Sequence, residues 1–164
     1  MLVVELSEDL QDEVVQRALR GDIAGALELT TLEHIASCYC AYHAARVDRA
    51  ADSPALDDET NWWAVMFAFD VCRDPEAAKR FLLALVDAPG ADDVALVIGA
   101  GPFEDVLGFG DDDLDWIEEH AATSEVFRAA LRNMRIPREI PEAVHIRVHR
   151  AAGHRPERWG KYNP

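Results

Sequence analysis

Basic residues are missing from a long central part of the sequence. Residues 81–127 hold twelve Asp and Glu and no Lys or Arg, and the whole chain of 164 residues carries a formal net charge of −15. A nucleic-acid binder needs a positive field that displaces the counterions of the phosphate backbone. Only residues 128–164, with nine Lys or Arg against three acids, have that sign. We therefore expect no nucleic-acid partner, and we expect the basic C-terminal part to fold back onto its acidic neighbour.

The sequence also lacks a long apolar run and the pattern of a secretion signal. No stretch approaches the roughly 18 apolar residues that span a bilayer. The first ten residues, MLVVELSEDL, have no basic start followed by a long apolar segment. These absences predict a cytoplasmic protein without a membrane partner.

Cysteine is scarce, and its number is odd. Cys38, Cys40 and Cys72 are the three that the sequence contains, so a disulfide framework is not expected. Cys38 and Cys40 lie two residues apart in an apolar helical segment, which places them on different faces of a helix. We interpret these two as buried reduced thiols.

Motifs of the common cofactor and nucleophile sites are absent as well. In GAGPFE, residues 99–104, Glu104 stands where a dinucleotide-binding fingerprint has its third glycine, and Pro102 lacks a donor N–H. No serine occurs in the G-x-S-x-G context of a nucleophile elbow. The sequence therefore predicts no cofactor and offers no catalytic residue that we would name.

Two pairs of side chains have a spacing that suits metal ligands. His145 and His149 lie one helical turn apart, and so do His34 and Cys38. Each pair needs two further ligands to hold a metal, and the sequence indicates none for either pair. We expect no metal site.

What the sequence does contain is helical periodicity broken by short joints. Apolar residues make up 49% of the chain, enough for a hydrophobic core. Ser7 and Asp74-Pro75 have the form of helix starts, and Gly21 has the form of a helix stop. Thr30 with Glu33, or Thr31 with His34, gives a restart inside the second helical region. Residues 58–71 are apolar on nearly every side and predict a central, buried helix.

Two segments leave alternatives open. Residues 2–6 suit a short strand or an extended lead-in, and residues 139–152 suit a strand or a helix, of which we favour the helix. The whole pattern predicts an all-α protein. We expect seven or eight short helices in antiparallel pairs, as an irregular bundle or a small α-solenoid-like stack. A single helical domain over residues 1–152 would be followed by an irregular basic tail over 153–164.

The stretch VIGAGPFEDVL, residues 97–107, is interpreted as a tight corner between two helices. Gly99 or Gly101 would take the left-handed conformation that closes the first helix, and Pro102 would begin the second. Glu104 would reach back to cap the glycine corner through backbone N–H groups.

The run from residue 62 to residue 131 resembles bacterial domain-of-unknown-function family six-eight-six-nine. The likeness rests on the aromatic-rich WWAVMFAFDVC, then DPEAAKRFLLAL, the hallmark IGAGPFEDVL, LDWIEEHAA and VFRAAL. The resemblance implies an all-helical fold, and it implies no reaction.

Carboxylates gather around the aromatic residues of FEDVLGFGDDDLDWIEEH, residues 103–120. One interpretation is a solvated surface over core aromatics. The other is a docking surface, because a partner that supplies Arg and Lys relieves the self-repulsion of so many like charges.

We expect a protein-binding module that captures a basic partner, of which a toxin-neutralising (immunity-type) protein is one example. The expected partner-binding residues are Asp111, Asp112, Asp113, Asp115, Glu118 and Glu119, with Glu104 and Asp105 as secondary ones. There are two alternatives. One is an enzyme with a carboxylate site near Gly99–Asp105, and the other is a homodimer that uses the aromatic helix Trp62–Phe69.

Overall fold

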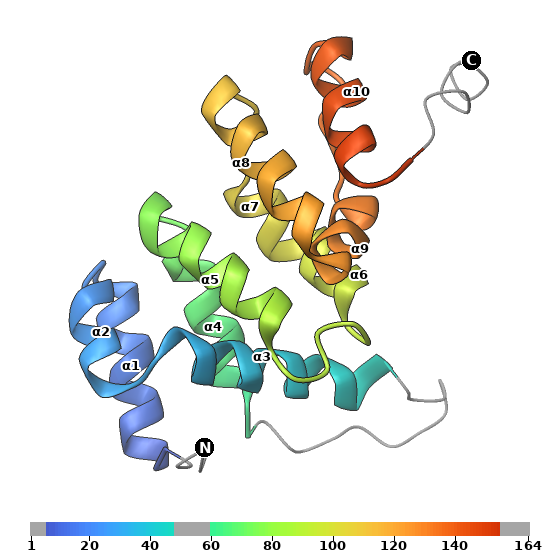
Figure 1. Ribbon diagram of the computed structural model, residues 1–164. Coiled ribbons are helices and arrows are strands. Elements are labelled where there is room, and N and C mark those ends of the chain that lie inside the picture. The colour runs from blue at the N-terminus through green and yellow to red at the C-terminus, as the bar shows by residue number, and fades with distance from the viewer. Residues whose placement is uncertain (1–5, 48–59, 155–164) are drawn as a thin grey trace. The chain divides into compact units, whose positions relative to one another are not determined.

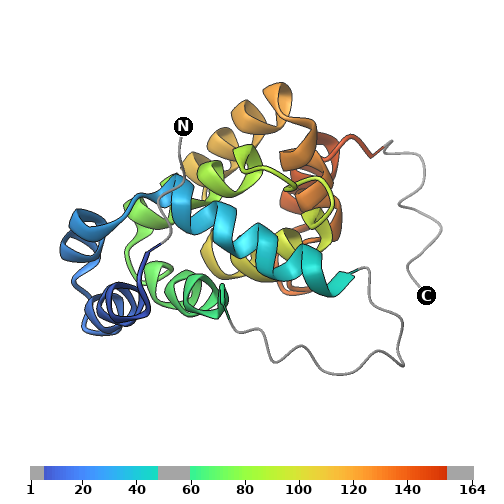
Figure 2. The same cartoon turned by 90° about the horizontal axis from the view of Figure 1, so that it is seen from below.

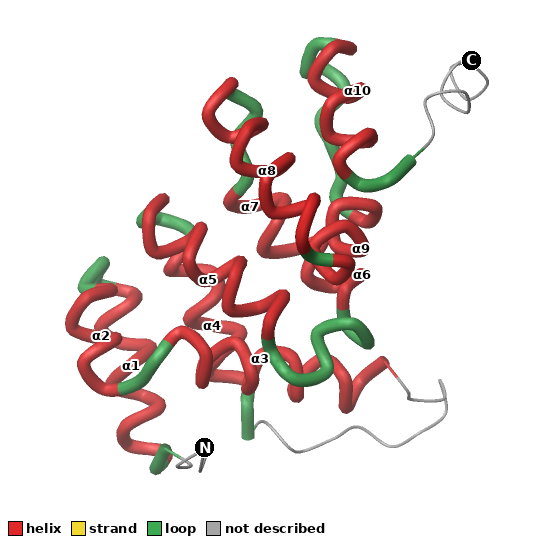
Figure 3. Tube along the Cα trace, in the orientation of Figure 1, coloured by secondary structure: helices red, strands yellow, loops and turns green. Residues whose placement is uncertain are grey.

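The computed structural model describes residues 6–47 and 60–154. Within these residues helices pack against helices and no strand occurs, which confirms the all-α prediction (Figures 1 and 3). The proposed lead-in over residues 2–6 lies almost wholly outside the described residues, as do residues 155–164 of the expected tail. The chain divides into two compact units, Met1–Val94 and Ala95–Pro164. The single domain over residues 1–152 stays a prediction.

The first unit is built from five helices. They are α1 (Glu8–Leu19), α2 (Ile23–Leu29), α3 (Leu32–Val47), α4 (Trp62–Val71) and α5 (Pro75–Asp87). Helix α1 lies beside α2 and α4, and α3 lies against α4 and α5 (Figures 1 and 2).

Short-range signals set the ends of these helices. Gly21 closes α1 with a φ of 79°, a left-handed conformation that glycine adopts without steric cost. The Asp74 carboxylate caps α5 by accepting hydrogen bonds from the N–H groups of Glu76 and Ala77, both at 3.1 Å. At the start of α3 the hydroxyl of Thr31 accepts from the His34 N–H at 3.2 Å, so the restart occurs at Thr31.

Aromatic rings fill the core of the first unit. Phe81 packs edge-on against Phe67, with ring centroids 6.0 Å apart, and against Tyr39 at 6.4 Å. Helix α4 supplies six buried apolar residues, as its apolar sequence predicts, and the buried Asp70. Its Trp62 and Phe69 are exceptions, because their side chains are 38% and 59% exposed.

The second unit contains the remaining helices. They are α6 (Ala95–Ile98), the π-helical turn η1 (Gly99–Phe103), α7 (Glu104–Val106), α8 (Asp111–Thr123), α9 (Glu125–Asn133) and α10 (Glu142–Ala151). Helix α9 packs against α6, α8 and α10. Helix α10 decides the alternative over residues 139–152 in favour of the helix.

The predicted corner at Gly99–Pro102 is wrong. Helix α6, the π-helical turn and α7 follow one another without a break, and neither Gly99 nor Gly101 has a positive φ. Gly99 is needed for another reason: a Cβ atom there would lie 2.2 Å from the carbonyl oxygen of Ala130 in α9. Pro102 is tolerated inside the run because the π-helical turn already interrupts the regular i to i−4 hydrogen bonds.

Two arginines of α9 fasten the C-terminal ends of its neighbours. Arg128 donates to the carbonyl of Ala121 at 2.5 Å near the end of α8, and Arg132 donates to the carbonyl of Ala152 at 3.0 Å just after α10. Glu125 pairs with both guanidinium groups, at 2.6 and 2.9 Å, and they hold the pKa of its carboxyl below the usual value. The last turns of α8 and α10 are therefore tied to one side of α9.

Candidate functional site: the acidic face of α8

Helix α8 begins with three successive aspartates, Asp111 to Asp113, where the positive end of the helix dipole favours carboxylates. The apolar residues of the helix, Leu114 and Ile117, are buried. Their burial turns the rest of the helix, with most of its carboxylates, toward solvent.

A single arginine from α10 engages one flank of this helix. The guanidinium of Arg147 donates to Glu118 at 2.7 and 3.0 Å and to Asp115 at 2.6 Å. It also lies 3.9 Å from a carboxylate oxygen of Asp111. Hydrogen bonds from Arg147 lower the pKa of Glu118. Helix α10, which lies within the basic C-terminal part, thus folds back onto the acidic segment, as the charge distribution predicts. Arg147 itself was not singled out by the sequence, because its register against α8 depends on how the two helices pack.

We call the group that consists of Arg147, Asp111, Asp115 and Glu118 the Arg147 cluster. The other carboxylates of α8 lie outside this cluster. Asp113 is half-buried and leans toward the preceding turn, where a Cβ atom at Gly108 would lie 2.2 Å from its Oδ2. Asp112 and Glu119 are exposed and have no partner among the residues that the structure describes. The six predicted residues therefore fall into three sets, and only one set is open to a new partner without rearrangement.

The two secondary residues also differ from each other. Glu104 does not cap the glycine segment, so that prediction is wrong. Its Oε1 accepts a hydrogen bond of 2.8 Å from the backbone N–H of Arg135, just past the end of α9. The reason is that the continuous helix run points Glu104 away from Gly99 and toward the chain that leaves α9. Asp105 is exposed and has no partner within residues 6–47 and 60–154.

Contacts between aromatic rings hold α8 in position within the second unit. Phe103 of the π-helical turn is fully buried and lies 4.8 Å, centroid to centroid, from Phe127 of α9. Trp116 of α8 lies 5.6 Å from Phe127 and 4.3 Å from His120. The aromatic residues between the carboxylates thus belong largely to the packing of the second unit, which fixes the position of α8.

The cysteines and histidines form no comparable centre. Burial raises the pKa of the Cys40 thiol to about 12, which makes it a poor nucleophile. Cys38 is half-buried rather than buried, and its sulfur lies 3.8 Å from Nε2 of His34. No group of three or more His, Cys, Asp or Glu in the described parts of the chain is arranged to hold a metal ion.

These observations define an all-α protein whose second unit presents an acidic helix braced by one arginine. Residues 51–155 match the model of a family described as Family of unknown function (DUF6869). The match covers more than half of the chain, so the protein belongs to that family. It reaches past the run 62–131 on both sides and includes α10, which carries Arg147.

No curated protein and no solved structure matches this chain. Among the helices of the described residues, none has the length and apolar character needed to cross a membrane.

Proposed function

We propose that this protein is a protein-binding module that captures a basic partner through the acidic face of α8. A protein that neutralises a toxin by binding it, as immunity proteins do, is one such module. The observation that carries the proposal is the pair of open carboxylates, Asp112 and Glu119, on a helix whose other acids are already engaged.

The geometry of these two residues suits basic side chains on a partner. Asp112 and Glu119 lie seven residues apart, which is two turns and about 10 Å along one helix face. The Arg147 cluster fixes the adjacent flank, so the two open carboxylates stand on a helix that is already held in place. Such preorganisation reduces the entropy lost on binding.

The charge of the region favours rapid capture. Between residues 95 and 154 the chain has eleven Asp and Glu and six Arg. A field of one sign attracts an oppositely charged protein and raises its association rate, an effect that salt weakens. A nuclease or another cation-rich protein has the chemistry that this surface would bind.

A charge reversal tests the proposal. The parent protein and the variant Asp112→Lys/Glu119→Lys are each used to capture proteins from the native cells, and captured proteins are identified by mass spectrometry. We expect the parent to retain a basic protein that the variant loses. With that partner purified, the variant should associate more than about tenfold more slowly at low salt, and the difference should shrink at high salt.

The matched control is Glu8→Lys/Asp9→Lys, which changes the net charge equally at two exposed positions of α1. It should retain the partner nearly as well as the parent does. Equal loss of partner binding in both variants would show that the effect arises from net charge alone. Unchanged binding in the α8 variant would refute the proposal.

A second candidate function, a homodimer subunit, is favoured by the exposed aromatic residues of α4. Trp62 and Phe69 lie seven residues apart on one helix face and are 38% and 59% exposed. If this face mediates dimerisation, sedimentation velocity should show a concentration-dependent dimer that Phe69→Ser abolishes. Leu96→Ser, at a position of α6 that is 63% exposed, should leave the dimer intact. A parent protein that stays monomeric at 100 µM or so would remove this candidate.

The enzyme alternative near Gly99–Asp105 has no comparable support. Glu104 is engaged by the Arg135 N–H, and the segment is a continuous helix run.

A further inference from the structure

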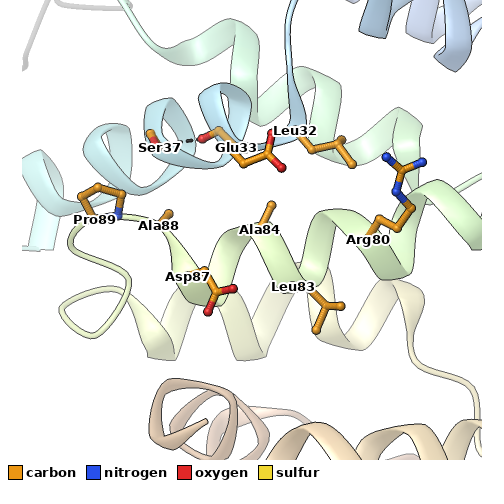
Figure 4. A pocket seen from close by; sticks show the side chains of 9 residues that line it. All are labelled: Leu32, Glu33, Ser37, Arg80, Leu83, Ala84, Asp87, Ala88 and Pro89. Atoms are coloured by element: carbon orange, nitrogen blue, oxygen red, sulfur yellow. Dashed lines mark hydrogen bonds between the residues drawn. The ribbon is translucent and has the colours of Figure 1, made fainter. Parts of the chain in front are cut away.

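The first unit contains a cavity that the acidic face does not use. A hollow of about 300 Å³ lies between α3 and α5, with Leu32, Leu83 and Ala84 among its apolar lining residues (Figure 4). This volume is at the lower end of the range for small-molecule sites, roughly 300–1,000 Å³. The cavity therefore suits one small ligand or a single terminal residue of a peptide.

Three charged side chains line the same cavity. They are Glu33 from α3, and Arg80 and Asp87 from α5. Figure 4 shows Glu33 pointing from α3 toward α5, with Arg80 at the Leu32 end and Asp87 closer to the Pro89 end. All three residues are exposed, and none of their side chains has an ion-pair or hydrogen-bond partner in the described residues. A cavity with two unpaired carboxylates and one unpaired guanidinium favours a ligand that carries both signs of charge.

The spacing of the charges sets the form of that ligand. Arg80 and Asp87 lie seven residues apart in one helix, so their backbones are about 10 Å apart. Apolar residues, Leu83 and Ala84, lie between them in the sequence and line the cavity. A ligand with a cation at one end, a carboxylate at the other and an aliphatic chain between them matches this order.

We propose that the cavity between α3 and α5 binds a carboxyl-terminal arginine or an N-acylated arginine. The ligand's guanidinium lies between Glu33 and Asp87, and its methylene groups cover Ala84 and Leu83. Its carboxylate pairs with Arg80, in the two-pronged geometry that guanidinium and carboxylate groups adopt. The α-nitrogen is acylated, because a free ammonium group beside the carboxylate would lie near the positive charge of Arg80. This proposal is independent of the function proposed for α8.

The experiment is a titration of the ¹⁵N-labelled full chain with three ligands, followed by NMR and calorimetry. The probes are N-acetyl-L-arginine, N-acetyl-L-citrulline, which lacks the cation, and N-acetyl-L-arginine amide, which lacks the carboxylate. We expect N-acetyl-L-arginine to shift the amide signals of α3 and α5 in a saturable way. Each analogue should bind about tenfold more weakly, because each loses one charge-assisted interaction.

Variants of the exposed residues that line the cavity show which residues bind each end of the ligand. Arg80→Gln should bind the acid and the amide equally well, and Glu33→Gln/Asp87→Asn should bind the arginine and citrulline compounds equally well. Arg20→Gln, at a largely exposed arginine just after α1, is the matched control and should behave as the parent does. Circular dichroism checks that every variant is folded.

Two outcomes would overturn the proposal. One is the absence of saturable shifts in α3 and α5, and the other is equal affinity of the parent for all three ligands. A pentapeptide of sequence Gly-Ser-Gly-Ser-Arg distinguishes between the two sources from which the ligand could come. Tighter binding of this peptide than of N-acetyl-L-arginine assigns the site to a polypeptide C-terminus, and equal or weaker binding assigns it to a small acylated amino acid.

Discussion

Replacing Gly99 with alanine is expected to lower the free energy of unfolding by about 2–3 kcal/mol, although alanine is the better helix former. The added Cβ atom would lie 2.2 Å from the Ala130 carbonyl oxygen and 2.9 Å from Cβ of Asn133. The first contact is with the backbone of α9, which cannot move without shifting the helix. Helix α6 and the π-helical turn must then separate from α9, and this loosens packing around the buried rings of Phe103 and Phe127.

Gly108→Ala is the matched control for this experiment. A Cβ atom at Gly108 would also meet an atom at 2.2 Å, but that atom is Oδ2 of Asp113, at the far end of a side chain that can rotate away. The control should lose no more than about 0.5–1 kcal/mol. Urea unfolding followed by circular dichroism measures both variants. Similar losses at the two positions would contradict the close approach of α6 to α9, and so would a Gly99→Ala variant that is as stable as the parent.

The local signals of the sequence predict much of the fold. The cap at Asp74 and the stop at Gly21 depend on residues within a few positions of each other. Such short-range chemistry is written directly in the sequence. The same is true of the apolar stripe of α9, which buries Phe127 and Leu131.

The Gly99–Pro102 segment shows why the rest could not be predicted. Glycine and proline usually indicate a turn, and nothing local distinguishes a glycine that permits positive φ from one that permits close contact. The distinction depends on Ala130, which is 31 residues away in the sequence. Glu104 was misassigned for the same reason, since its partner is the N–H of Arg135. The charged cavity residues Glu33 and Arg80 were not predicted, because they lie on two different helices. The sequence does not indicate that these two helices pack against each other.

Replacing Arg147 with methionine is expected to loosen α10 while leaving the first unit intact. Helix α10 buries little apolar surface of its own, with Val148 as its one fully buried residue. Its attachment to α8 therefore depends strongly on the Arg147 cluster. Methionine keeps the apolar stem but leaves Asp111, Asp115 and Glu118 as neighbouring carboxylates without their shared cation. Hydrogen exchange of residues 142–151, followed by mass spectrometry at pH 7, should become about tenfold faster.

The dependence on pH separates this ionic role from simple packing. Arg147 lowers the folded pKa of Glu118 below its unfolded value of about 4.5. The stability that Glu118 contributes is therefore complete above that unfolded pKa and is lost as the pH falls through the folded pKa. The difference between parent and variant should be large at pH 6–8 and should shrink as the pH is lowered from about 4.5 toward 3. Arg150→Met, at an exposed arginine of the same helix, should leave the exchange rate close to that of the parent at both pH values. Equal acceleration in both arginine variants, or a difference that persists undiminished at pH 3, would show that the carboxylates of α8 do not hold α10 through Arg147.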